Sequence, residues 1–170
     1  FGKSLTVNML QHYYDILAKD KFEALFGDLY IGKHPTRDRN SYLVLYLNFS
    51  GIVGELHNYR KGLDAHCQTM FDYFCDIYAD YLPKGIKEEL DKKEGAVEQF
   101  EYLFTERNKT NQRIYLFIDE YDHFTNAILS DIESLHRYTD ETYGESYLRA
   151  FFNKIKAGPI PASSVVSSPA

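Results

Sequence analysis

The chain has 170 residues, which is the length of one domain or part of one. Its 44% hydrophobic and 16% aromatic residues are sufficient for a packed core and argue against extensive disorder. The net charge of −6, with no Lys/Arg stripe interleaved with aromatic residues, argues against direct nucleic-acid contact by this segment.

The first half of the chain combines short helical patterns with one apolar strand. Apolar residues at three- and four-residue steps predict a helix over 4–19, and a short second helix follows over 21–29. Residues 32–40 contain Gly, Pro, Asp and Asn, which predict a loop. Residues 41–49 are apolar nearly throughout and too short for a typical helix, which predicts a strand buried on both faces in a parallel sheet.

The second half contains longer helical patterns and a second apolar strand. Helical periodicity predicts helices over 56–82, 95–106, 124–136 and 145–156, with a charged, solvent-facing segment over 84–94. Residues 114–118 predict a second buried strand, so the two strands and their helical crossover form a right-handed βαβ unit. From Gly158 onward there are three Pro in 13 residues and no charge, which predicts an irregular Pro/Ser-rich tail over 158–170.

The first residues match the second half of a phosphate-binding loop. Gly2-Lys3-Ser4 precedes the first predicted helix, whose N-terminal N–H groups would face phosphates. In a P-loop the Lys contacts the β- and γ-phosphates and the hydroxyl binds Mg²⁺, roles that fall to Lys3 and Ser4. Such a triplet also arises by chance, and the alternative is a Ser that caps a helix without further function.

A pair of acids follows the second predicted strand. Asp119 and Glu120 come directly after five apolar residues, at the strand end where α/β sheets bind ligands. In P-loop ATPases this Asp orients Mg²⁺, and the Glu can polarise the attacking water as a general base. The alternative is a strand that ends in a polar turn with solvated acids. Asp122 follows, and we expect it to cap the next helix rather than to contact metal.

Taken together, these motifs resemble the bacterial AAA-ATPase-like domain family, whose P-loop typically reads Arg-Arg-Phe-Gly-Lys-Ser. The resemblance rests on Phe1-Gly-Lys-Ser-Leu, the strand at 41–49 and Leu116-Phe-Ile-Asp-Glu-Tyr-Asp, and it covers residues 1 to about 157. Many members carry a restriction-nuclease-like domain downstream, so the resemblance implies such a domain or a protein partner. It also implies ATP and Mg²⁺ as cofactors, with the nucleotide at Gly2, Lys3, Ser4 and Leu5, the metal at Ser4 and Asp119, and Glu120 as the catalytic residue.

The expected fold is α/β, a partial P-loop NTPase three-layer α/β/α domain that is helix-rich with a small parallel sheet. The P-loop class that the family resembles has the sheet order 5-1-4-3-2, in which 41–49 and 114–118 would be strands 2 and 3. Strand 1 would precede Phe1, and the tail does not read like strand 4. We therefore interpret 1–157 as a partial domain and expect this chain alone to bind ATP weakly or not at all.

Two other functions fit fewer features of the sequence. A non-catalytic ATPase-like scaffold would dock a partner on Tyr-rich helices. The feature that favours it is the long helix predicted for 56–82, which has aromatic residues outside its apolar stripe, Tyr73 and Tyr78; the alternative is plain core packing. A metal-dependent nuclease built on Asp119, Glu120 and Asp122 would need acids spread over several strands plus a Lys, and the sequence shows no such set.

Compartment and redox state follow from what the sequence lacks. No apolar stretch approaches the roughly 18 residues of a membrane span, and no secretory leader pattern is seen. We expect a cytoplasmic protein without membrane contact. Cys67 and Cys75 are eight residues apart in a helical pattern, which favours two buried thiols over a disulfide or a metal pair.

Overall fold

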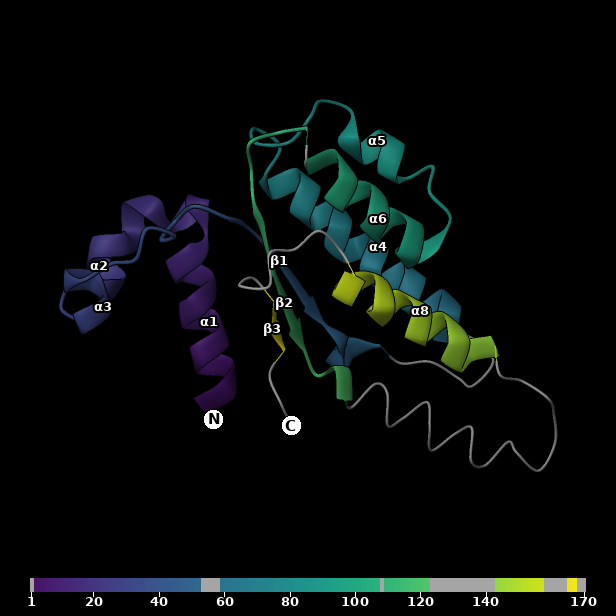
Figure 1. Cartoon of the computed structure of the whole chain (residues 1–170), viewed down its shortest axis with the longest axis horizontal. Helices are drawn as coiled ribbons and strands as arrows, with labels where there is room; N and C mark the ends of the chain where they lie inside the picture. Colours follow the sequence, from purple (N-terminus) through teal and green to yellow (C-terminus); the bar gives the residue numbers. More distant parts are fainter. Residues whose placement is uncertain (1, 53–58, 108, 123–142, 158–164, 168–170) are drawn as a thin grey trace.

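A small parallel sheet lies between helices on both of its faces (Figure 1). The computed structural model of the protein describes residues 2–52, 59–107, 109–122, 143–157 and 165–167. The sheet contains β1 (Leu43–Asn48), β2 (Ile114–Asp119) and β3 (Val165–Ser167), in that spatial order. Both strand pairs are parallel, so β2 occupies the centre. The expected helix-rich α/β fold with a small parallel sheet is confirmed.

The two faces of the sheet carry different helices. One face packs against α4 (Tyr59–Ile77), α6 (Gly95–Arg107) and α8 (Tyr143–Ala157), with the short α5 (Ile86–Leu90) beside α6. The opposite face packs against α1 (Gly2–Tyr14) through a smaller cluster centred on Tyr42, Tyr115 and Phe117. The molecule therefore has the three layers expected of this fold class (Figure 1).

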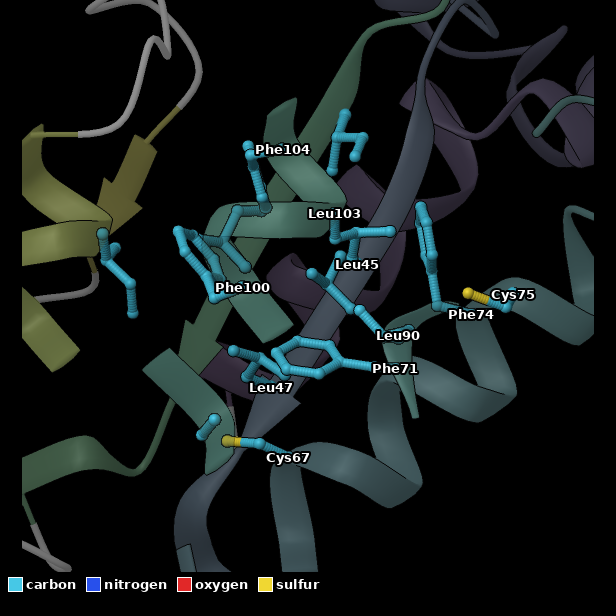
Figure 2. Packing of buried hydrophobic residues seen from close by; sticks show 14 of the residues in the cluster. Leu45, Leu47, Cys67, Phe71, Phe74, Cys75, Leu90, Phe100, Leu103 and Phe104 are labelled. Atoms are coloured by element: carbon cyan, nitrogen blue, oxygen red, sulfur yellow. The ribbon is translucent and has the colours of Figure 1, made fainter. Parts of the chain in front are cut away.

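The main core forms between the sheet and the helices that follow β1. Figure 2 shows leucines of β1 among phenylalanines of α4 and α6, and the labelled residues are Leu45, Leu47, Cys67, Phe71, Phe74, Cys75, Leu90, Phe100, Leu103 and Phe104. Cys67 and Cys75 are free thiols in this core, as expected. Among the described residues, no helix is long and apolar enough to cross a membrane.

The two long strands differ in burial because of their places in the sheet. All six residues of β2 are buried, since this strand has a neighbour on each side and helices on each face. In β1 only the alternate residues Leu43, Leu45 and Leu47 are fully buried, while the residues between them are partly exposed. The prediction of a strand buried on both faces is therefore wrong for β1, which lies at the sheet edge and is only partly covered by α1 on the face opposite the main core.

The first predicted helix stops earlier than its periodicity indicates. α1 ends at Tyr14, and Asp15 adopts an extended conformation. The Asp15 carboxylate accepts a hydrogen bond from the Leu17 N–H at 2.9 Å. A 3₁₀ helix, η1 (Ile16–Lys21), follows it. The reason is strand-like pairing, because the Ile16 N–H donates to the Tyr42 carbonyl at 2.9 Å and thereby draws the chain onto the sheet edge.

The remaining helical predictions agree with the structure in kind and differ in extent. The second helix appears as α2 (Phe22–Phe26), and α3 (Tyr30–Lys33) occupies the start of the predicted loop. The helix predicted for 56–82 is confirmed over the range of α4, and those predicted for 95–106 and 145–156 are confirmed as α6 and α8. The helix predicted for 124–136 lies outside the described residues.

The end of the chain differs from the irregular tail expected for 158–170. Val165–Ser167 forms β3, pairing with β2 in the register Leu116–Val165, Phe117–Val166 and Ile118–Ser167. Two adjacent β-branched valines favour an extended backbone, and β2 presents an edge for them to pair with. In the order 5-1-4-3-2 this position next to strand 3, opposite strand 2, belongs to strand 4. The other residues of the tail lie outside the described part of the chain.

Candidate functional site

The carboxyl ends of β1 and β2 bring polar side chains to the face of the sheet that α1 covers. Along β2, Tyr115 and Phe117 face α1, whereas Ile114, Leu116 and Ile118 face the main core. Because side chains alternate along a strand, Asp119 falls on the α1 side. The register places Asn48 directly beside Asp119, so both strands end at the same level.

Helix α1 brings Lys3 to these strand ends. The Lys3 Nζ lies 3.0 Å from Asp119 Oδ1 and 3.6 Å from Glu120 Oε1. The Asp119 residue is only 5% exposed, whereas the side chains of Lys3 and Glu120 are 36% and 42% exposed. A buried carboxylate is thus neutralised by a cation that remains open to solvent on one side.

The charges in this cluster shift each other's proton affinities. Burial alone would raise the pKa of Asp119, but hydrogen bonds from Lys3 and Tyr46 outweigh it and hold this pKa below its usual range. The hydrogen bond to Asp119 raises the pKa of Lys3, and the charges of Glu120 and Asp122 act in the same direction. Both partners of the ion pair are therefore charged at neutral pH.

The other oxygen of Asp119 is held by β1. The Tyr46 hydroxyl donates to Asp119 Oδ2 at 3.1 Å, and Asn48 Nδ2 donates to the Tyr46 oxygen at 3.1 Å. The Ser50 N–H in turn donates to Asn48 Oδ1 at 2.9 Å. Burial and the neighbouring Asp119 raise the pKa of Tyr46, which keeps its hydroxyl protonated and able to donate.

Glu120 turns the chain away from the sheet. Its φ of +57° lies in the left-handed region, which a non-glycine residue adopts at a cost of about 1–2 kcal/mol. Its N–H donates to Asp119 Oδ1 at 3.0 Å, so the turn closes back onto the strand end. This conformation directs Glu120 toward the solvent side of the site, within reach of Lys3.

The structure brings together some of the predicted site residues and not others. Lys3, Asp119 and Glu120 meet, although Lys3 lies in the first turn of α1 and the acids lie at the end of β2 and directly after it. Gly2, Ser4 and Leu5 lie in the exposed first turn of α1, and within the described chain no hydrogen bond or ion pair joins Ser4 to either acid. The helix that Asp122 was expected to cap falls in the segment outside the described residues.

Sequence reasoning missed the participation of Tyr46 and Asn48. The signal was present in the alternation of β1, since Tyr46 and Asn48 are two residues apart and share a face. It could not be used without the register, which alone places that face beside Asp119.

The donor set suits a hard cation with few protein ligands. In the described parts of the chain, no group of three or more His, Cys, Asp or Glu side chains is arranged to hold a metal ion. Mg²⁺ commonly uses one or two protein oxygens and completes its shell with water and phosphate oxygens. One buried carboxylate at a strand end is compatible with that requirement.

A parallel sheet, a lysine at the start of the facing helix and an acid pair ending the central strand define a P-loop-like α/β domain. The model of the AAA-ATPase-like family, described as predicted AAA-ATPase, matches residues 1–166. The chain therefore belongs to this family, and its general function is ATPase-like. Comparisons with curated proteins and with solved structures give no match.

Proposed function

We propose that this chain supplies the ATP-binding site of a Mg²⁺-dependent ATPase. The observation that carries the proposal is the contact of Lys3 with both Asp119 and Glu120 at the end of the central strand. A phosphate-binding lysine and the acids of the metal site must lie within a few ångströms of one another, because they act on the same phosphate groups.

Each residue then has a defined role. Lys3 leaves the acids and contacts the β- and γ-phosphates, while the N–H groups of Gly2, Ser4 and Leu5 at the start of α1 face the phosphate oxygens. Asp119 and the Ser4 hydroxyl would hold Mg²⁺, which would supply positive charge to neutralise the phosphates. Glu120, on the open side of the site, polarises the attacking water as the general base.

Two substitutions in the full-length protein test these roles separately. Lys3→Ala should abolish ATP binding measured by isothermal titration, whereas Glu120→Gln should keep binding and lower the hydrolysis rate at least about 100-fold. Lys84→Ala and Glu88→Gln are matched controls, since both side chains are exposed in or near α5. Unchanged binding and turnover in both site variants would refute the assignment.

A non-catalytic scaffold that binds a protein partner remains the second candidate. A cavity of about 440 Å³ between α1, β1 and α4 favours it, with Met70, Tyr73 and Ile77 on the α4 side. Tyr73 is 63% exposed, but Tyr78 is buried and belongs to the core, contrary to its expected place outside the helix's apolar stripe. ATP binding that depends on Lys3 would decide in favour of the ATPase.

A further inference from the structure

Asp119 is the end of a hydrogen-bonded series that runs through β1. The series passes from the Ser50 N–H to Asn48 Oδ1, from Asn48 Nδ2 to the Tyr46 oxygen, and from the Tyr46 hydroxyl to Asp119 Oδ2. Tyr46 and Asn48 are partly buried, and Asp119 is almost fully buried. The series therefore runs from an exposed end at Ser50 to a buried end at Asp119, where water has little access to replace the Tyr46 hydroxyl.

The direction of the series is fixed at both ends. A backbone N–H can only donate, so the Ser50 N–H must bind the amide oxygen of Asn48. The NH₂ group of Asn48 is then directed toward Tyr46. The Tyr46 oxygen thus accepts from Asn48, and its single proton remains for Asp119. An ionised carboxylate can only accept, which matches this direction at the other end.

The two oxygens of Asp119 consequently have separate tasks. Oδ2 is bound by Tyr46, whereas Oδ1 accepts from the Glu120 N–H and contacts Lys3. When Lys3 turns to a phosphate, Oδ1 loses a partner while Oδ2 keeps its own. The bond from Tyr46 on β1 then resists rotation of the carboxylate, so Oδ1 stays on the side that Lys3 of α1 contacts.

We propose that Tyr46 is a positioning residue for Asp119 and that Asn48 orients the Tyr46 hydroxyl for this task. This inference rests on the proposed function, because it takes Asp119 as a residue that would hold nucleotide-bound Mg²⁺. It adds two residues of the neighbouring strand to the site. Neither residue touches the nucleotide in this arrangement, and both act through Asp119.

Tyr46→Phe in the full-length protein tests the positioning role. ATP affinity is measured by isothermal titration with Mg²⁺ and, separately, in EDTA. We expect the affinity for Mg·ATP to fall about tenfold, as is typical when a residue that orients a metal ligand is lost, and the affinity in EDTA to remain unchanged. Tyr115→Phe is the matched control, because it removes the same hydroxyl from the same sheet face, where Tyr115 stacks on Tyr14 and Phe117.

A second measurement detects the hydrogen bonds without nucleotide. The ¹³Cζ resonance of Tyr46 reports on the bonds of its hydroxyl and is assigned by its loss in Tyr46→Phe. Asn48→Asp retains an acceptor for the Ser50 N–H but removes the donor to Tyr46, so it should shift this resonance. Asp119→Asn should shift it as well, whereas Glu88→Gln should not.

The outcomes separate this inference from the proposed function. A parent protein that binds no Mg·ATP refutes the proposed function and this role with it. Normal binding by the parent, with equal Mg·ATP affinity in Tyr46→Phe, refutes the positioning role alone. A Tyr46 resonance unaffected by both Asn48→Asp and Asp119→Asn shows that the series does not form, which also overturns the inference.

Discussion

Tyr78 joins three separate parts of the fold through one buried hydroxyl, so its removal is a sharp test of the packing. The hydroxyl donates to Asp15 Oδ1 at 2.8 Å and accepts from the Val44 N–H at 3.0 Å. Its ring is buried beside Phe74, and burial raises the pKa of Tyr78, so the hydroxyl remains a donor throughout the accessible pH range. One atom therefore holds the end of α1 and the edge of β1 against the segment after α4.

The expected loss of unfolding free energy in Tyr78→Phe follows from the groups that lose a hydrogen-bond partner. Tyr78→Phe leaves the ring packing intact but removes two hydrogen bonds. The Val44 N–H loses its acceptor, and the Asp15 carboxylate loses one of its donors. A buried group left without its partner costs about 1–3 kcal/mol, and Asp15 retains the Leu17 N–H, so we expect a loss of about 2 kcal/mol. For a chain of this length the loss corresponds to a fall in Tm of about 4–8 °C.

Urea unfolding followed by circular dichroism measures this loss. Tyr81→Phe is the control, because Tyr81 is a partly buried neighbour whose ring packs against Tyr78. A loss below about 0.5 kcal/mol, or one equal to that of Tyr81→Phe, would show that the Tyr78 hydroxyl does not join these elements.

Three further predictions concern stability and reactivity. Since the pKa of Asp119 is held below its usual value in the folded protein, its charge contributes stability above the ordinary pKa of about 4 and loses it as pH falls toward the folded-state pKa. Unfolding free energy below pH 4 should therefore fall more steeply in the parent than in Asp119→Asn, and equal slopes would contradict this. Burial raises the pKa of the Cys67 thiol and raises the pKa of Cys75 to about 12. A disulfide reagent at pH 8 should therefore modify both thiols only after the protein unfolds. Rapid reaction with the native protein would refute their burial. Phe100→Ala removes a ring that stacks on Phe104 in the core, and should cost about 3–5 kcal/mol in urea unfolding, against less than about 0.5 kcal/mol for Tyr30→Ala at an 80% exposed position.

The sequence was informative where local pattern and environment agree. In β2, five apolar residues are followed by Asp119. The apolar run predicted the buried strand, because a central strand is apolar on both faces, and the acid that follows marked the end of the strand. Lys3 and Asp119 could be assigned to one site because a parallel sheet collects its ligand-binding groups at the carboxyl ends of the strands.

Features that depend on pairing between distant segments could not be predicted. The early end of α1 results from a hydrogen bond to Tyr42, and no signal within α1 itself specifies it. The three residues of β3 become a strand only because β2 offers an edge, although their surroundings contain Pro and Ser. The contact of Tyr46 with Asp119 requires the register of β1 against β2, which single-sequence periodicity does not contain.

The parallel pairing of β1 and β2 also has a consequence for the order of folding. Tyr46 and Asp119 are separated by 73 residues along the chain, and Lys3 is farther still from Asp119. Closing such long loops is slow compared with forming α4 or α6, whose contacts are local. Asp119 therefore has neither its lysine nor its tyrosine partner until the sheet has formed. The contact between Lys3 and Asp119 should be among the last native interactions to form.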